Sequence, residues 1–226
     1  MYGNGGSIMP EPVSLAVLGG GIAGLVARFL RRGFAEVKRS IDVIGASLLL
    51  VFFGPIILIL AAIVKLTSKG PAFFTQVRVG KDGRLFNMIK LRSMRVHAEN
   101  ETGPVWAKKD DPRITTVGHV MRKTHLDETP QLINVLMGDM SLIGPRPERP
   151  FFVNEFRRSI PRYEGRLAVR PGITGLAQVK HKYDENIEDV RKKLTYDLAY
   201  VDSMSWVTDA KIAFLTFGMI AGKNAR

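Results

Sequence analysis

Apolar residues along the chain form one long uninterrupted run, followed by shorter alternating and helical patterns. The run covers residues 43–64, reads VIGASLLLVFFGPIILILAAIV and contains no charged side chain. This length meets the usual criterion of about 18 apolar residues for a membrane helix. Gly54 and Pro55 lie near its centre, where proline removes a backbone donor and clashes with the preceding turn. We therefore predict a membrane helix that is kinked or broken at Gly54-Pro55.

Cationic side chains flank both ends of this run. They are Arg31, Arg32, Lys38 and Arg39 before it, and Lys65 and Lys69 after it. Because positive charge is retained on the cytoplasmic side of a membrane, both ends prefer the same side. A hairpin with arms of about ten residues would reach roughly 15 Å into a hydrocarbon layer of about 30 Å. These charges leave a re-entrant hairpin and a kinked full span equally open, since proline is tolerated in spanning helices.

After Lys69 the pattern becomes mixed, with frequent glycine and proline, as is typical of a globular domain. Residues 72–79 and 84–91 alternate around Gly80-Lys81-Asp82-Gly83 and predict a β-hairpin. Helical spacing recurs at residues 116–126, 129–136 and 187–201.

Residues 205–220 combine Trp206, Phe214 and Phe217 with aliphatic side chains. They predict either an amphipathic helix at the membrane interface or an ordinary core helix. The expected class is α+β, with a kinked or re-entrant membrane helix, a small and mainly helical domain that carries a β-hairpin, and interfacial amphipathic helices. The expected segments are a glycine-rich start (1–35), the membrane helix (36–70) and a globular domain (71–226).

Composition narrows the function classes. Lys and Arg total 33 against 21 acidic residues, a net charge of +12, so anionic partners such as nucleic acid, lipid headgroups or phosphorylated substrates are favoured. The absence of cysteine excludes disulfides, thiolate nucleophiles and cysteine metal sites. The four histidines lack metal-ligand spacing, so we expect no zinc site.

Glycines near the start resemble a dinucleotide-binding turn. Gly19, Gly21 and Gly24 form a GxGxxG pattern, and Glu36 or Asp42 could contact a ribose. That fingerprint needs a βαβ unit, whereas the membrane run follows here. A membrane-associated helix or flexible arm is therefore favoured over a membrane-tethered oxidoreductase.

Adjacent acids occur in the stretch RKTHLDETPQLINVLMGDMSLIG, residues 122–144. Asp127 and Glu128 precede a predicted helix, which taken alone is typical of a solvated helix start. Arg122 lies five residues upstream, and Arg146 lies between two prolines in a stiff loop suited to bidentate phosphate binding. A carboxylate can attack phosphorus when cations offset the repulsion, and Mg²⁺ bound by carboxylates and substrate oxygens is the usual solution. The spacing permits such a site.

Three further cations are candidates for anion contact. Arg170, in VRPGITGLAQVK (residues 169–180), could contact a nucleotide phosphate or stabilise its turn, which leads into a short apolar strand. Lys90 and Arg92 lie beside the second hairpin strand and could face an anionic ligand or headgroups, although a solvated strand edge is the simpler interpretation for each.

Six ordered motifs resemble one known family. They are KRSID, GPAFFTQVRVGKDGRLF, KLRSM, DPRITTVG, LDETPQLINVLMGDMSLIGPRPE and VRPGITGLAQV. From about residue 38 to 221 the chain resembles the bacterial sugar transferases, the monotopic phosphoglycosyl transferases that begin polysaccharide and glycoconjugate assembly. Gly54, Thr129 and Leu176 stand where this family often has Ser, Leu and Trp.

The resemblance implies a mechanism and a set of site residues. Asp127 would be the nucleophile, forming a covalent phosphosugar intermediate in a ping-pong scheme, and would lie at a Mg²⁺ ion. Glu128 would activate the lipid phosphate or orient the metal site, with Arg122 and Arg146 as phosphate or carboxylate partners. The membrane helix would be re-entrant, turned at Pro55, and residues 71–226 would form the catalytic domain.

The implied partners are a UDP-hexose, undecaprenyl phosphate and the bacterial inner membrane, with the catalytic domain on the cytoplasmic face and no nucleic acid. A homo-oligomer stays open. DPRITTVGH and PERPFFVNEF resemble exopolysaccharide initiators that carry glucose or galactose. The four membrane spans that precede this domain in longer relatives have no counterpart in this sequence, so a minimal form is expected. The rival hypothesis is a non-catalytic basic membrane adaptor of polysaccharide assembly.

Overall fold

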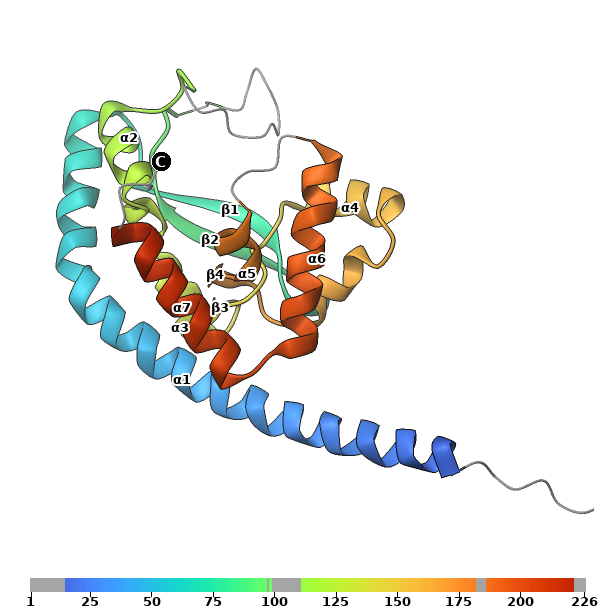
Figure 1. Ribbon diagram of the computed structural model, residues 1–226. Coiled ribbons are helices and arrows are strands. Elements are labelled where there is room, and N and C mark those ends of the chain that lie inside the picture. Colours follow the sequence, from blue (N-terminus) through green and yellow to red (C-terminus); the bar gives the residue numbers. More distant parts are fainter. Residues whose placement is uncertain (1–14, 97, 99–110, 182–185, 222–226) are drawn as a thin grey trace, which may run out of the picture. The chain divides into compact units, whose positions relative to one another are not determined.

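The computed structural model describes residues 15–96, 98, 111–181 and 186–221. This part of the chain is mainly helical and contains two two-stranded sheets (Figure 1). It divides into two compact units, Met1–Lys38 and Arg39–Arg226. The α+β class predicted from the sequence is confirmed.

The first helix, α1, covers Leu15–Thr67. Gly19, Gly21 and Gly24 lie within its helical backbone. A dinucleotide-binding turn would instead place such glycines between a strand and a helix. The segment is therefore helical here, and the oxidoreductase hypothesis loses its structural basis.

A long apolar segment of α1, Val37–Thr67, is the one stretch in the described part of the chain with the length and composition to cross a membrane. Gly54 and Pro55 lie inside it, and the backbone is helical on both sides of them. In Figure 1 the helix changes direction along its light-blue to cyan part. Pro55 gives a physical reason for a bend, because it lacks an N–H and its ring crowds the preceding turn.

The predicted β-hairpin is confirmed. Strands β1 (Phe73–Val79) and β2 (Leu85–Leu91) pair antiparallel, from Phe73 opposite Leu91 to Val79 opposite Leu85. The turn between them needs the left-handed backbone at Asp82 (φ 55°) and Gly83 (φ 78°). Glycine adopts this region without steric cost, which explains the turn sequence.

Two predicted helices follow the hairpin. Helix α2 (Thr116–Lys123) starts at Thr115, whose hydroxyl accepts a hydrogen bond from the Gly118 N–H at 3.0 Å. A short 3-10 helix, η2 (Leu126–Glu128), leads into α3 (Gln131–Met137), which ends at Gly138 with φ 94°. Helices predicted at residues 116–126 and 129–136 are thus present, with shorter ends.

A small parallel sheet comes next, and the sequence only partly predicted it. Strands β3 (Ser141–Ile143) and β4 (Gly172–Thr174) are linked by α4 (Pro150–Ser159) and the 3-10 helix η3 (Tyr163–Ala168). The apolar strand expected within residues 169–180 is β4, whereas the rest of that range forms α5 (Leu176–Lys180). A Cβ on Gly172 would lie 2.1 Å from the Gly144 nitrogen, so this sheet needs glycine there.

The last two predicted helices are also present, as α6 (Ile187–Ser203) and α7 (Trp206–Ala221). Helix α7 packs on the domain through Ile212, which is buried with Ile143 and Tyr200. Phe214 and Phe217 of the same helix are 78% and 72% exposed. The core contact is therefore confirmed for one face of α7, and the membrane contact stays a prediction for the other.

From Arg39 onward, α1 is part of the core of the second unit. Its Ala46 is fully buried against α3 and β2, and Ile57 and Val64 pack with Leu91 and Met121. The Arg39 guanidinium donates to the carbonyls of Val135 and Leu136 at 2.6 and 3.0 Å, in the last turn of α3. A cation at this position complements the helix dipole.

Candidate active site

Asp127 and Glu128 lie at the junction of α2 and α3. His125, in the left-handed region with φ 57°, interrupts the helical backbone after α2, and η2 then carries both acids. Pro130 precedes the first residue of α3, where its missing N–H leaves no broken hydrogen bond. The two carboxylates are therefore held by a rigid turn at the start of α3, close to the predicted position.

Glu128 is bound by two cations from distant parts of the chain. Lys90 Nζ lies 2.7 Å from Glu128 Oε1, and Arg146 donates through both terminal nitrogens, Nη1 to Oε2 at 3.0 Å and Nη2 to Oε1 at 2.5 Å. Burial alone would raise the pKa of Glu128, but Arg146 and Lys90 hold it well below its ordinary value. Glu128 is thus a fixed anion that orients two cations.

The Asp127 side chain is in a different state from its neighbour. It is 6% exposed, and no described residue donates a hydrogen bond to its carboxylate or forms an ion pair with it. Burial, and then the negative charge of Glu128, raise the pKa of Asp127, while Lys90, Arg122 and Arg146 act in the opposite direction. A buried carboxylate without a partner is costly in a fold and is typical of a site that binds or reacts with a ligand.

Lys90 and Arg92 are both inside the protein, so the interpretation as a solvated strand edge is wrong for each. Burial lowers the pKa of the Lys90 ammonium, and its contact with Glu128 opposes that shift. Arg92 donates to the carbonyls of Lys69 and Ser68 at 2.5 and 3.0 Å and fixes the chain after α1. Lys90 therefore belongs to the candidate site, and Arg92 supports the fold.

The two remaining predicted arginines are placed differently. Arg122 Nε donates to the Ser93 hydroxyl at 2.9 Å, and its charge acts on Asp127. Arg170 Nε donates to the Gly138 carbonyl at 2.9 Å, at the end of α3 opposite to Asp127. The structure thus brings Arg122 and Arg146 to the acids and gives Arg170 a partner in the turn, while a phosphate contact of Arg170 stays a prediction.

The loop that carries Arg146, residues 144–148, is held by main-chain contacts at each of its last four carbonyls. Pro145 and Glu148 accept from the N–H groups of Gly172 and Val79, both at 2.9 Å. Arg146 and Pro147 accept from the guanidinium groups of Arg166 and Arg78, at 2.7 and 3.1 Å. The loop is therefore a rigid support for the Arg146 side chain.

Glu148 ends this loop in an ion pair that makes folding stability depend on pH. Burial would raise the pKa of Glu148, but Lys193, whose Nζ lies 2.6 Å away, together with Arg166 and Arg78 lowers it from 4.5 to about 2. Because the folded-state pKa is depressed, the stabilisation is complete above pH 4.5 and is lost as the pH falls toward 2.

We expect Glu148→Gln to lower the unfolding free energy at pH 7 by about 3 kcal/mol, because it leaves the Lys193 ammonium without its buried anion. The variant should also lose part of the decline in stability between pH 5 and pH 3. Thermal unfolding of the purified protein in detergent measures both effects, with the exposed Glu155→Gln on α4 as the control. An unchanged pH dependence in Glu148→Gln would contradict the assignment.

The fit of a magnesium ion depends on Asp127. The described residues contain no group of three acidic or histidine side chains that could enclose a metal. Mg²⁺ is, however, commonly bound by one or two carboxylates together with substrate phosphates and water. With Glu128 occupied by Lys90 and Arg146, the unpartnered Asp127 carboxylate is the group that fits this mode.

Comparison with known proteins identifies relatives. The family model described as bacterial sugar transferase matches residues 34–223. The UDP-N-acetylgalactosamine-undecaprenyl-phosphate N-acetylgalactosaminephosphotransferase of Aeromonas hydrophila is 46% identical over 194 residues, which are 85% of this chain and 46% of the relative.

Two UDP-glucose:undecaprenyl-phosphate glucose-1-phosphate transferases are also similar. The protein of Klebsiella pneumoniae is 46% identical over 181 residues, which are 79% of this chain and 39% of the relative. The protein of Caulobacter vibrioides is 42% identical over 183 residues, covering 79% of this chain and 67% of the relative. This chain spans less than half the length of the Aeromonas and Klebsiella relatives.

Proposed function

Because this chain belongs to the bacterial sugar transferase family, we propose that it transfers glucose 1-phosphate or galactose 1-phosphate from a UDP-sugar to undecaprenyl phosphate. UMP would be released, and the product would begin an exopolysaccharide or glycoconjugate. The relatives are named as transferases that act on a UDP-sugar and undecaprenyl phosphate, which supports this substrate pair. The observation that carries the proposal is the buried Asp127 carboxylate, which has no partner among the described residues. The adjacent Glu128 binds two cations, Lys90 and Arg146.

In the first step, an Asp127 carboxylate oxygen attacks the phosphorus that bears the sugar. A bond forms between this oxygen and phosphorus, and the bond from phosphorus to the bridging oxygen breaks, so that UMP leaves with the electron pair. The raised pKa of Asp127 favours this attack, because a more basic carboxylate is a stronger nucleophile. In the second step, an oxygen of undecaprenyl phosphate attacks the same phosphorus and regenerates the carboxylate.

Glu128 serves this chemistry by orienting cations. A general base must have a pKa near the working pH, whereas the pKa of Glu128 is well below its ordinary value. Activation of the lipid phosphate is therefore the weaker of the two roles implied for it. Glu128 instead fixes Lys90 and Arg146 where charge develops on the transferring phosphoryl group.

A Mg²⁺ ion held by Asp127 and the diphosphate of the donor would offset the negative charge that opposes attack by a carboxylate. Arg122 and Arg146 contribute positive charge to the same end, since both act on Asp127. The Gly138 contact of Arg170 uses Nε, so its terminal nitrogens would serve a contact with a nucleotide phosphate.

The lipid substrate requires a site at the inner membrane, with the catalytic domain on the cytoplasmic face. Exposed apolar side chains on α1 fit a hydrocarbon environment, with Leu48, Val51 and Leu58 between 68% and 79% exposed. Phe214 and Phe217 on α7 fit the headgroup region. We infer that α1 is re-entrant at Pro55, because the resemblance to the bacterial sugar transferases implies it and the cations at both ends of the apolar segment are compatible with it.

Cysteine labelling tests the re-entrant helix, and the chain contains no native cysteine. Ser40→Cys and Lys69→Cys, both at exposed positions, should each react with a membrane-impermeant maleimide only when the cytoplasmic face is accessible. Val51→Cys, in the apolar segment, should stay unreactive from either face in intact vesicles. Labelling of Ser40→Cys and Lys69→Cys from opposite faces would establish a full span instead.

Release of UMP distinguishes the transferase from a basic membrane adaptor. The purified full chain should release UMP from at least one of UDP-glucose, UDP-galactose and the corresponding N-acetylated donors when undecaprenyl phosphate and Mg²⁺ are present. An adaptor would bind anionic vesicles without turnover. Its buried Asp127 would also have no purpose, which is why we favour the enzyme.

A further inference from the structure

The Arg146 main chain is held by a fully buried ion pair that lies outside the candidate site. Arg166 in η3 and Asp197 on α6 have side chains only 3% and 2% exposed, and both Nε and Nη2 of Arg166 lie 2.8 Å from Asp197 Oδ2. Arg166 Nη2 also donates to the Arg146 carbonyl at 2.7 Å. The Arg166 guanidinium thus connects α6 to Arg146, the residue whose side chain binds Glu128.

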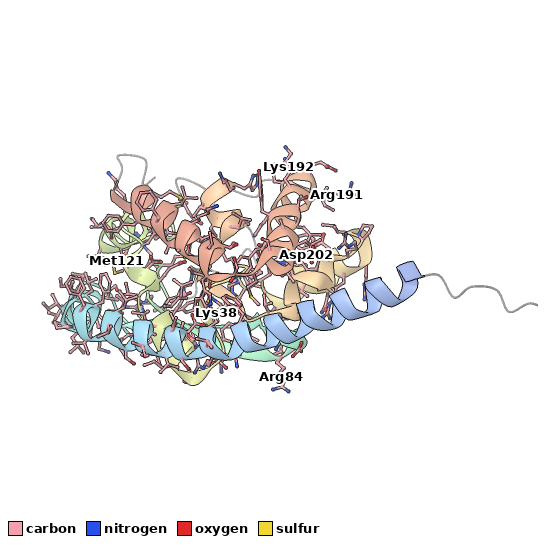
Figure 2. The ribbon with its side chains drawn as sticks, turned by 60° about the horizontal axis from the view of Figure 1, so that its bottom comes forward. Lys38, Arg84, Met121, Arg191, Lys192 and Asp202 are labelled. Carbon is pink, nitrogen blue, oxygen red and sulfur yellow. The ribbon has the colours of Figure 1, made fainter. Side chains whose placement is uncertain are left out.

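One face of α6 is connected to the loop at two points, directly through Lys193 and indirectly through Asp197 and Arg166. Lys193 and Asp197 are four residues apart and therefore lie on the same side of the helix. Lys193 binds Glu148 at 2.6 Å, and Asp197 reaches Arg146 through Arg166. The adjacent Arg191 and Lys192 point away from the ribbon in Figure 2. The inward charges of α6 are therefore directed at the loop that ends in Glu148.

Stability alone is a poor explanation of the Arg166–Asp197 pair. Removing two charges from water costs about as much as their attraction returns, and apolar side chains of similar volume are often equally stabilising. A hydrogen bond from a fixed guanidinium does, however, constrain the distance and direction to one carbonyl oxygen, whereas apolar burial is not directional. Bidentate binding of Glu128 by Arg146 needs such placement.

We propose that Arg166 and Asp197 are positioning residues for the transfer reaction, acting through the main chain of Arg146. The inference rests on the proposed function and adds α6 to the elements that set the site. It requires that a change in Asp197 or Arg166 matter only while Arg146 is present.

A double-mutant cycle tests this requirement in the full-length protein in detergent. Asp197→Asn keeps the shape of the side chain and removes its charge. Arg166→Lys keeps the charge, but an ammonium cannot reproduce the simultaneous contacts of the guanidinium with Asp197 and the Arg146 carbonyl. Each should lower kcat/KM for the UDP-sugar by about tenfold to a hundredfold, as is usual for a misplaced catalytic group. In an Arg146→Ala background the same changes should lower kcat/KM further by less than about twofold, because the effects of coupled residues are not additive.

Tyr163→Phe is the matched control, since it removes the Tyr163 hydroxyl that accepts from Arg166 Nη1 at 3.1 Å and retains the other contacts. It should leave kcat/KM within about twofold of the parent, because the contacts of Arg166 with Asp197 and with the Arg146 carbonyl are kept. Losses that multiply fully in the Arg146→Ala background, or an equal loss in Tyr163→Phe, would overturn the proposal in favour of a general structural role.

Hydrogen exchange gives a readout that does not need turnover. The amides of Gly172 and Val79 donate to the loop at Pro145 and Glu148, so both should exchange faster in Arg166→Lys and Asp197→Asn than in Tyr163→Phe. If the parent protein released no UMP from any donor, the proposed function would fail, and this exchange result would still decide whether the ion pair fixes the loop. Unchanged exchange at both amides would overturn the positioning role.

Discussion

Asp127→Asn is expected to lower the rate of UMP release by about 10⁴-fold or more, as for loss of a nucleophile in other covalent catalysts. Asparagine has the same shape as aspartate, but its amide is a poor nucleophile toward phosphorus. The loss should be in kcat, since the carboxylate is needed for bond formation. The variant should fold, because no described residue pairs with the Asp127 carboxylate. Its melting temperature should equal or exceed that of the parent, since a buried unpaired charge is removed.

Trapping gives the direct measurement. A donor labelled in the sugar, mixed with the parent protein without lipid acceptor, should leave about one label per active site on the protein, and hydroxylamine should release it as expected for an acyl phosphate. Asp82→Asn is the matched control, because Asp82 is exposed in the β1–β2 turn at a positive φ that asparagine accepts. Normal turnover by Asp127→Asn, or kinetics that require both substrates bound together, would refute the covalent scheme.

Arg146→Ala is expected to have the second largest effect, a fall in kcat/KM of about a hundredfold to a thousandfold, as for loss of one group that stabilises transition-state charge. The change removes both hydrogen bonds to Glu128 and leaves Lys90 as its remaining cation partner. It also removes positive charge near Asp127. Arg146→Lys should recover only part of the loss, because an ammonium cannot reproduce the bidentate contact.

Initial-rate kinetics with UDP-sugar and undecaprenyl phosphate measure this effect. Arg84→Ala serves as the control, since Arg84 lies at the end of the hairpin turn, is exposed and points away from the ribbon in Figure 2. Equal kinetics for Arg146→Ala and the parent would remove Arg146 from the site. A loss confined to KM would instead indicate that Arg146 contributes to ground-state binding alone.

Elements with a strong local pattern were predicted well from the sequence. The long apolar helix α1, the β1–β2 hairpin and helices α6 and α7 each have a hydrophobic pattern or a turn signal within their own residues. Strands β3 and β4 have three residues each, which is too short for an alternation to be recognised. They are held by pairing with each other, 31 positions apart, and no local signal reports such a contact.

In the candidate site, too, residues with a local signal were predicted and residues held by distant contacts were not. Asp127, Glu128 and Arg146 were found because acids and a proline-flanked arginine lie close together in sequence. Lys90 was considered as a candidate for anion contact, but a solvated strand edge was preferred, because its partner Glu128 is 38 positions away. One signal was present, since alternation along β2 places Lys90 on the same face as Met88, which is 3% exposed.

The buried charges around the loop were missed for a similar reason. Lys193 and Asp197 share one face of α6 with the buried Tyr200. Charges on an inward face indicate buried partners, although the sequence does not say which ones. The partners Glu148 and Arg166 are 45 and 31 positions away.

The contacts of α1 with α3 and β3 limit how far the protein can be shortened from its amino terminus. Arg39 closes the end of α3, Asp42 accepts the Leu142 N–H at 3.1 Å, and Ala46 fills a fully enclosed position. Deleting the residues up to Thr67 would remove these groups from the rest of the second unit and expose the surface beneath them. Residues 39–67 of α1 are thus a structural part of the second unit, and a fragment made by deleting them should aggregate.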